Sequence, residues 1–135
     1  MNPFSLVILA AERTFYEGTC VSLIIPTLDG QYGIQANHSN AIGAVAPGSL
    51  KFTTPEGEER IAAVSEGFVK IENNQVLVLV DTAERPEEID ENRARHSAED
   101  AKERLLQAKS IQEYHAAQVK MARAINRLKV KKSYK

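Results

Sequence analysis

Hydrophobic positions follow one period in the first part of the chain and another in the second. From Phe4 to Val80, nine short apolar runs rich in Val, Ile and Phe alternate with turn formers such as Asp29-Gly30 and Asn73-Asn74. Short runs between such turns predict β-strands, and with no helical segments between them the strands are expected to pair antiparallel. The first part is therefore predicted to be an antiparallel sandwich or barrel.

The pattern changes after Pro86, beyond which neither Gly nor Pro occurs again. Ala, Glu, Gln, Lys and Arg dominate, which is typical of helices. Apolar residues recur at steps of three and four on two stripes, and between the stripes Ser110 and Glu113 have the spacing of a helix capping box. This predicts two antiparallel helices with a bend near Lys109. The stripes are Ala94, Ala98, Ala101, Leu105 and Ala108, and then Ala117, Met121, Ala124 and Leu128, with Tyr114, Gln118 and Ile125 beside them.

The predicted fold class is therefore α+β, with an N-terminal antiparallel β-sandwich domain over residues 1–85 and a C-terminal two-helix antiparallel hairpin domain over residues 86–135. The helical stripes are mostly alanine, and an alanine face buries much less apolar area than a leucine face. A hairpin held this weakly could exchange between folded and open states, as a switch requires. An ordinary packed hairpin is an equal alternative on the pattern alone.

Charge divides the chain at the same place. The net charge is −1, but residues 1–85 carry five basic and ten acidic residues, whereas residues 86–135 carry twelve and eight. The last sixteen residues hold seven basic groups and no acid, so their charge is left uncompensated within that segment. Cys20 is alone and cannot form an internal disulfide, and no apolar run is long enough to cross a membrane. We expect a soluble, cytosolic chain.

Candidate chemistry is sparse, which argues against an enzyme. His38, His96 and His115 lack the spacing of metal ligands, and no phosphate-binding glycine loop is present. His38 with Ser39 could be imagined as a base and a nucleophile, but adjacent residues seldom face each other correctly. The basic end could bind nucleic acid. The acidic residues of the first part argue against a nucleic-acid interface, so a solvated helix end is favoured, followed by a site for an acidic protein.

The segment IDENRA at 89–94 is the other candidate. Asp90 and Arg93 are three residues apart and share a face of a helix. One interpretation is an exposed ion pair with Asp90 favouring the helix start. The other is a nucleotide site, in which the carboxylate accepts from an amino group and the guanidinium binds a phosphate. Spacing alone favours the first interpretation.

Five segments make the chain resemble the epsilon subunit of the bacterial F-type ATP synthase over nearly its whole length. They are YEG at 16–18, DGQYGIQANH at 29–38, PGSLKF at 47–52, VSEGFVKI at 64–71 and VLVLVDTAERPEEIDENRA at 76–94. The last is the most specific, since its strand, its Ala-Glu-Arg corner and the I/L-D-x-x-R-A element come in the order of the family.

The resemblance implies a non-catalytic subunit of the rotating central stalk, peripheral to the cytoplasmic face of the plasma membrane. Its implied partners are the gamma subunit, the c-ring and an acidic segment of the catalytic beta subunit, with no nucleic acid. In the family the helices can open and inhibit ATP hydrolysis. No cofactor is implied as a requirement, but ATP is implied as a possible regulatory ligand. A stand-alone nucleotide-sensing or nucleic-acid-binding module remains the alternative.

The resemblance also implies site residues. A c-ring contact would include Gln31 and His38, although Gln31 stands where an acid is common in the family. Asp100 stands where ATP-binding members can have an arginine, and its charge would repel phosphate. The residues implied for regulatory ATP are Glu84, Ile89, Asp90, Arg93, Ala94, Arg123 and Arg127.

Overall fold

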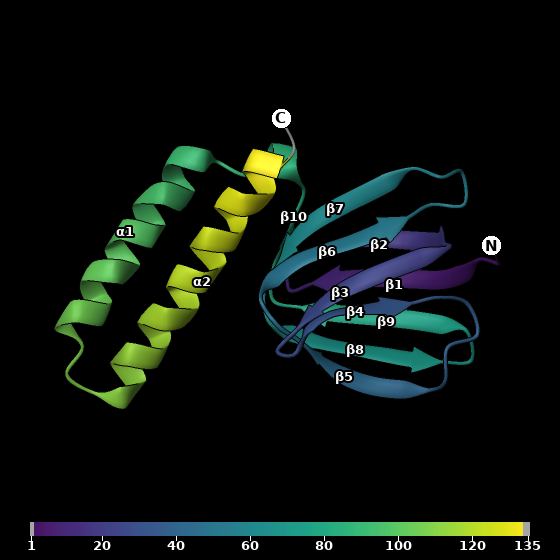
Figure 1. Cartoon of the computed structure of the whole chain (residues 1–135), viewed down its shortest axis with the longest axis horizontal. Helices are drawn as coiled ribbons and strands as arrows, with labels where there is room; N and C mark the ends of the chain where they lie inside the picture. Colours follow the sequence, from purple (N-terminus) through teal and green to yellow (C-terminus); the bar gives the residue numbers. More distant parts are fainter. Residues whose placement is uncertain (1, 134–135) are drawn as a thin grey trace. The chain divides into compact units, whose positions relative to one another are not determined.

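The computed structural model describes residues 2–133. Internal contacts divide the chain into two compact units, with residues 1–85 in the first and residues 86–135 in the second (Figure 1). The first unit contains strands and the second contains helices, so the change of period in the sequence marks a change of secondary structure. The predicted fold class, a β-sandwich followed by a two-helix hairpin, is confirmed.

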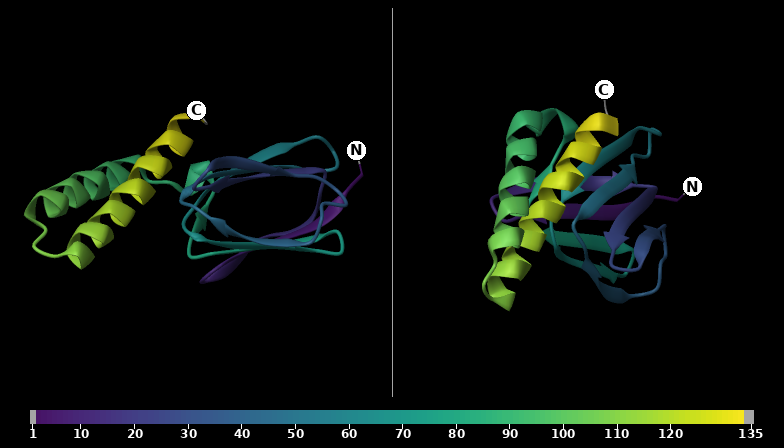
Figure 2. Two further views of the ribbon diagram at one scale, coloured as in Figure 1. Left: turned by 60° about the horizontal axis from the view of Figure 1, so that its bottom comes forward. Right: turned by 60° about the vertical axis from the view of Figure 1, so that its left-hand side comes forward.

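The first unit consists of two five-stranded sheets, which Figure 2 shows stacked face to face. Each of the nine predicted runs forms a strand, and the short β10 is an addition that the sequence pattern did not predict. In spatial order, one sheet is β2 (Arg13–Cys20), β1 (Phe4–Ala10), β9 (Gln75–Val80), β8 (Gly67–Glu72) and β5 (Ala41–Val45). The other is β10 (Ala83–Glu84), β7 (Glu59–Val64), β6 (Gly48–Thr53), β3 (Ser22–Thr27) and β4 (Gly30–Ile34).

One pairing differs from the antiparallel expectation. Strands β1 and β9 are parallel, with Leu6 opposite Val76. They come from the two ends of the unit, so no turn between them fixes their relative direction, and the local pattern could not have revealed it. Within each sheet, the other strand pairings are antiparallel.

The turns form where the sequence placed them. Asn73 and Asn74 have φ values of 51° and 63°, and they join Glu72 of β8 to Gln75 of β9 as a two-residue hairpin loop. Positive φ at both positions suits the right-handed twist of the paired strands, and asparagine tolerates it better than most residues.

The core of the sandwich lies between the sheets. Alternate residues point inward on strands such as β1 and β9. Leu6 and Ile8 of β1 are fully buried in this way. Cys20 is also buried, and burial raises the pKa of its thiol to about 11. The other fully or nearly fully buried large side chains of this unit are Leu23, Ile25, Ile34, Leu50, Phe52 and Val78.

The second unit starts with a single 3-10 turn, η1 (Pro86–Glu88), and continues as α1 (Glu91–Gln107) and α2 (Ile111–Ser133). The two helices lie antiparallel (Figure 1) and bury one alanine face each. The buried alanines include Ala94, Ala101, Ala117 and Ala124, all on the predicted stripes. Val130 is 1% exposed and was not predicted to be buried.

The start of α2 after the bend is capped nearly as the predicted capping box requires. The backbone amide of Glu113 donates to Oγ of Ser110 at 3.1 Å. The Glu113 carboxylate accepts from the amide of Lys109 at 2.9 Å, one residue before the amide that a standard capping box would satisfy. Both contacts satisfy amides that have no partner inside the helix, so α2 has a defined start.

Candidate functional site

The first turn of α1 contains the candidate nucleotide residues. Asp90 is the N-cap of this helix, and its Oδ1 accepts a hydrogen bond from the backbone amide of Arg93 at 3.1 Å. Ile89 and Ala94 are buried, at 4% and 3% exposure. The side chains of Asp90 and Arg93 are exposed. The segment therefore begins a helix, as the simpler interpretation predicted, and still presents one carboxylate and one guanidinium to solvent.

The pairing of the two helices brings the other candidate cations to the same end of the hairpin. Nζ of Lys120 on α2 donates to Oδ2 of Asp100 on α1, which fixes the register of the antiparallel pair. Arg93 lies seven residues before Asp100 on α1, and Arg127 lies seven residues after Lys120 on α2. Seven residues make two helical turns, so in this antiparallel pair helix geometry brings both arginines to one level, on the faces that carry the contact. Arg127 and Arg123, one turn earlier, are half-buried.

Glu84, the remaining residue implied for ATP, belongs to the first unit. It lies on β10, is half-buried, and pairs with Ala63 of β7. Glu84 thus belongs to the sandwich, whereas the other residues implied for ATP belong to the hairpin unit. These are Ile89, Asp90, Arg93, Ala94, Arg123 and Arg127.

Asp100 is paired with cations, a contact that the sequence pattern did not predict. Its Oδ2 accepts from Lys120 and lies 3.2 Å from Nε of Arg104. The hydrogen bond from Lys120, followed by the charges of Arg104, Lys120 and His96, lowers the pKa of the Asp100 carboxyl. The carboxylate is therefore ionised and largely compensated, so it repels an added phosphate less than an isolated charge would.

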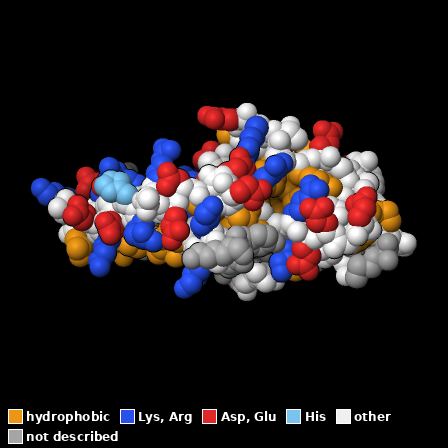
Figure 3. Space-filling model, turned by 90° about the horizontal axis from the view of Figure 1, so that it is seen from above, with side chains coloured by type: hydrophobic (Ala, Val, Ile, Leu, Met, Phe, Trp, Pro, Cys, Tyr) orange, Lys and Arg blue, Asp and Glu red, His pale blue; other side chains and the backbone are white. Residues whose placement is uncertain are grey.

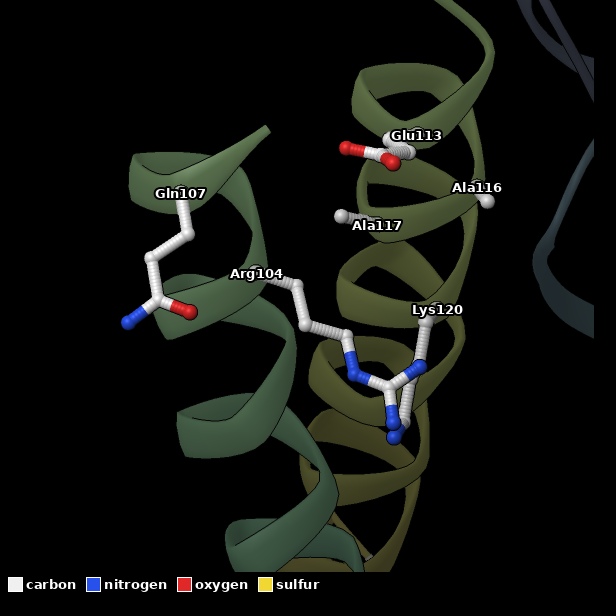
Figure 4. A pocket seen from close by; sticks show the side chains of 6 residues that line it. All are labelled: Arg104, Gln107, Glu113, Ala116, Ala117 and Lys120. Atoms are coloured by element: carbon white, nitrogen blue, oxygen red, sulfur yellow. The ribbon is translucent and has the colours of Figure 1, made fainter. Parts of the chain in front are cut away.

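A groove of about 340 Å³ lies between the helices near the bend. Figure 4 shows Arg104 extending from α1 towards Lys120 of α2, and Glu113 of α2 pointing towards α1. Gln107 of α1 also lines the groove. Its apolar lining is provided by Ala116 and Ala117. None of the residues implied for ATP lines this groove, so the two features of the hairpin are separate.

The basic end of the chain makes contacts outside its own segment, and an acid of α1 compensates one of its charges there. Lys120 pairs with Asp100, and Nζ of Lys131 donates to the backbone carbonyl of Pro86 at 3.1 Å. Both partners lie far away in the sequence, so the composition of the segment could not reveal them. Lys132 is exposed, and Lys135 lies outside the described residues.

On the sandwich, the candidate partner residues lie on and after β4. Gln31 is exposed and pairs with Pro26 of β3. Nδ1 of His38 contacts the backbone carbonyl of Ser39 at 2.8 Å, and Nε2 contacts the hydroxyl of Tyr32 at 2.6 Å. A carbonyl only accepts, so in the neutral imidazole Nδ1 carries the proton and Nε2 accepts from Tyr32. Neither nitrogen bonds the Ser39 hydroxyl, so the imagined base and nucleophile pair is not formed.

Charged side chains of both signs are interspersed on the face of the molecule seen in Figure 3. This distribution differs from the single basic stripe that is typical of nucleic-acid-binding surfaces. Within residues 2–133, no helix is both long and apolar enough to span a bilayer.

Two sequence models of one family match nearly the whole chain. The first is described as the beta-sandwich domain of the ATP synthase delta/epsilon chain and matches residues 3–86. The second is its long alpha-helix domain and matches residues 87–132. The chain belongs to the ATP synthase epsilon family. The resemblance first read from short motifs is thereby confirmed.

Curated relatives of the epsilon family align over most of their length. The ATP synthase epsilon chain of Ruminiclostridium cellulolyticum is 40% identical over 95% of each chain. That of Caldicellulosiruptor bescii is 36% identical over 96% of this chain and 94% of the relative.

Solved structures share the fold at lower identity. A chain of the Euglena gracilis mitochondrial ATP synthase, from a structure of OSCP, F1 and c-ring, has a TM-score of 0.75 at 20% identity, covering 87% of this chain and 74% of its own. A chain from the central stalk and c-ring of the Tetrahymena thermophila enzyme has a TM-score of 0.67 at 13% identity, covering 94% and 95%. At these identities the likeness concerns the fold alone.

Proposed function

We propose that this epsilon-family chain is a non-catalytic subunit of the central stalk of an F-type ATP synthase, and that its helical hairpin regulates ATP hydrolysis. The observation that carries the regulatory part is the alanine interface between α1 and α2. Because alanine side chains bury little area, the folded and open forms of the hairpin differ by a small free energy, which a ligand or a partner can reverse.

The partners follow from the family. The sandwich binds the gamma subunit and contacts the c-ring, and this contact includes Gln31, which is exposed, and His38, which is half-buried. The hydrogen bond from Tyr32 orients the His38 ring, so His38 can present a defined edge to the ring of c subunits. The open hairpin binds an acidic segment of the catalytic beta subunit through its basic end. The chain thereby lies at the cytoplasmic face of the plasma membrane.

Reconstitution of the ATP synthase with truncated chains tests the regulatory function. Deletion of residues 120–135 should raise ATP hydrolysis, because it removes the basic groups of α2 and leaves the sandwich in the complex. A chain ending after Gln107 should have the same effect. Hydrolysis that stays at the level of the full-length complex after both deletions would refute inhibition by the hairpin.

Co-purification separates a stalk subunit from a stand-alone module that senses nucleotide or binds nucleic acid. A stalk subunit should be recovered with the gamma subunit when either is tagged. Recovery of the chain without gamma, together with binding to nucleotide or nucleic acid, would favour the stand-alone module.

A second proposed function is ATP sensing at the start of α1, favoured by the common level of Arg93 and Arg127. Arg93 would bind the phosphates with Arg123 and Arg127, the second oxygen of Asp90 would accept from the adenine amino group, and Ile89 would contact the base. Ala94 would allow close approach, and Glu84 would complete the set implied by the family. Bound ATP would stabilise the folded hairpin by mass action.

Calorimetric titration of the isolated chain with ATP tests this site. Saturable heat is expected for the native chain and should be lost in Arg93→Ala. Arg95→Ala is the matched control, because Arg95 lies two residues further and pairs with Glu91. Absence of heat at millimolar ATP, or equal loss in both variants, would exclude the site and leave the stalk assignment unaffected.

A further inference from the structure

The two helices are joined by a small cluster of charges halfway along the hairpin. Figure 4 shows the side chains of Arg104, from α1, and Lys120, from α2, approaching each other. The repulsion between these two cations is offset by an anion close to both, which is the Oδ2 atom of Asp100. This oxygen accepts from Nζ of Lys120 and lies 3.2 Å from Nε of Arg104.

The position of the cluster distinguishes it from an ordinary surface ion pair. Asp100 and Lys120 have side chains that are 33% and 36% exposed, and Asp100 adjoins Ala101, which is fully buried in the interface. By contrast, Glu91 and Arg95 form a pair within α1 whose side chains are 47% and 56% exposed. Partial burial reduces screening by salt, and a link between two helices acts directly on the equilibrium between folded and open hairpins.

We propose that Asp100, Lys120 and Arg104 form an ionic clamp that keeps the hairpin folded when no nucleotide is bound. The alanine faces contribute little apolar burial, so a single interhelical ion cluster is a large share of what joins α1 to α2. The clamp uses a carboxylate supplied by the chain itself as the anion between two cations.

The regulatory consequence rests on the proposed function. When the hairpin opens, Asp100 loses Lys120, and this lysine joins the basic end of α2 as a ligand for an acidic segment. A carboxylate of that partner then competes with Asp100 for the same ammonium group. The clamp thereby links release of the hairpin to capture by an acidic surface.

Amide hydrogen exchange on the isolated full-length chain tests the clamp. Asp100→Asn and Lys120→Gln should each raise the exchange rates of the amides of Ala101, Ala117 and Ala124 by roughly two- to fivefold, as loss of a partly exposed ion pair predicts. The double variant should exchange no faster than about the faster of the two single variants. The charge-swapped double variant, Asp100→Lys with Lys120→Glu, should restore protection. Its carboxylate at position 120 then lies between two cations of α1.

Arg95→Gln is the matched control, since it breaks an ion pair confined to α1 and should leave exchange in α2 unchanged. Raising the salt concentration from about 0.05 M to about 1 M should accelerate exchange in the native hairpin and have a smaller effect in Asp100→Asn. The clamp would be overturned if both single variants left the exchange rates of α2 amides unchanged. It would also be overturned if the charge-swapped variant stayed as unprotected as the single variants. The assay contains no ATP and no partner, so its outcome is independent of the tests of inhibition and nucleotide binding.

Discussion

The Oδ1 atom of Asp90 accepts a hydrogen bond from the backbone amide of Arg93 at 3.1 Å, which joins the two central residues of the proposed nucleotide site. The same carboxylate caps α1, so Asp90 would serve helix stability and ligand recognition at once. Any substitution at Asp90 therefore has to be interpreted for both roles.

The two roles of Asp90 can be separated by the choice of substitution. Asp90→Ala removes the cap and should destabilise the hairpin by about 1 kcal/mol. Asp90→Ser keeps a hydroxyl that can accept from the Arg93 amide, so it should retain most of the helix stability while losing the acidic group. Hydrogen exchange of α1 amides measures the first effect and ATP titration the second. Equal protection in Asp90→Ala and the native chain would contradict the capping role.

The close approach of the helices depends on small side chains, which predicts a strong positional contrast on α2. Ala117 is 2% exposed, whereas the adjacent Ala116 is exposed. Ala117→Leu should force α1 and α2 apart and cost about 1–3 kcal/mol of hairpin stability. Ala116→Leu should be nearly neutral. Thermal unfolding followed by the helical circular dichroism signal compares the two variants, and similar stability for both would refute close packing at Ala117.

Local patterns in the sequence were enough to predict the sandwich and the hairpin. Apolar runs and turn residues located nine strands, and the spacing of Ser110 and Glu113 located the bend. These features depend on residues a few positions apart, where turn chemistry and helix capping act. The parallel pairing of β1 with β9 joins strands about seventy residues apart in the sequence, and no local rule determines it.

The candidate site was predictable only in part, for the same reason. The segment 89–94 was found because its residues are neighbours, whereas the pairing of Asp100 with Lys120 arises only when the hairpin closes. A signal was present, since reflecting the chain about a bend at Lys109 and Ser110 brings position 100 beside position 120. The contact between Tyr32 and His38 had no comparable signal, because it depends on the path of the loop after β4.

A third prediction concerns the sandwich on which the proposed partner contacts depend. A Cβ atom added to Gly67 would lie 1.9 Å from the carbonyl oxygen of Leu79 and 2.7 Å from Cα of Val80. Backbone atoms cannot move aside cheaply, so Gly67→Ala should lower the free energy of unfolding by about 1–3 kcal/mol. Gly33→Ala is the control, because nothing lies within 4 Å of its added Cβ. Denaturant unfolding measures both, and equal midpoints would show that β8 and β9 are less closely packed than described.

The last prediction follows from the lowered pKa of Asp100. The folded hairpin favours the ionised carboxyl, so its pKa is lower in the folded than in the open form. The resulting stabilisation is complete above the ordinary pKa of 3.8 and is lost as the pH falls through the folded value.

Protection of α2 amides should therefore decrease as the pH is lowered from about 6 to about 2, and decrease less in Asp100→Asn, which has no proton to gain. The native chain and Asp100→Asn share every other carboxylate, including Glu103 and Glu99 on α1, so the difference between their pH profiles isolates Asp100. His96, whose charge also acts on this carboxyl, is common to both chains. Parallel profiles across the acidic range would mean that the ionised form of Asp100 contributes nothing to holding α1 and α2 together.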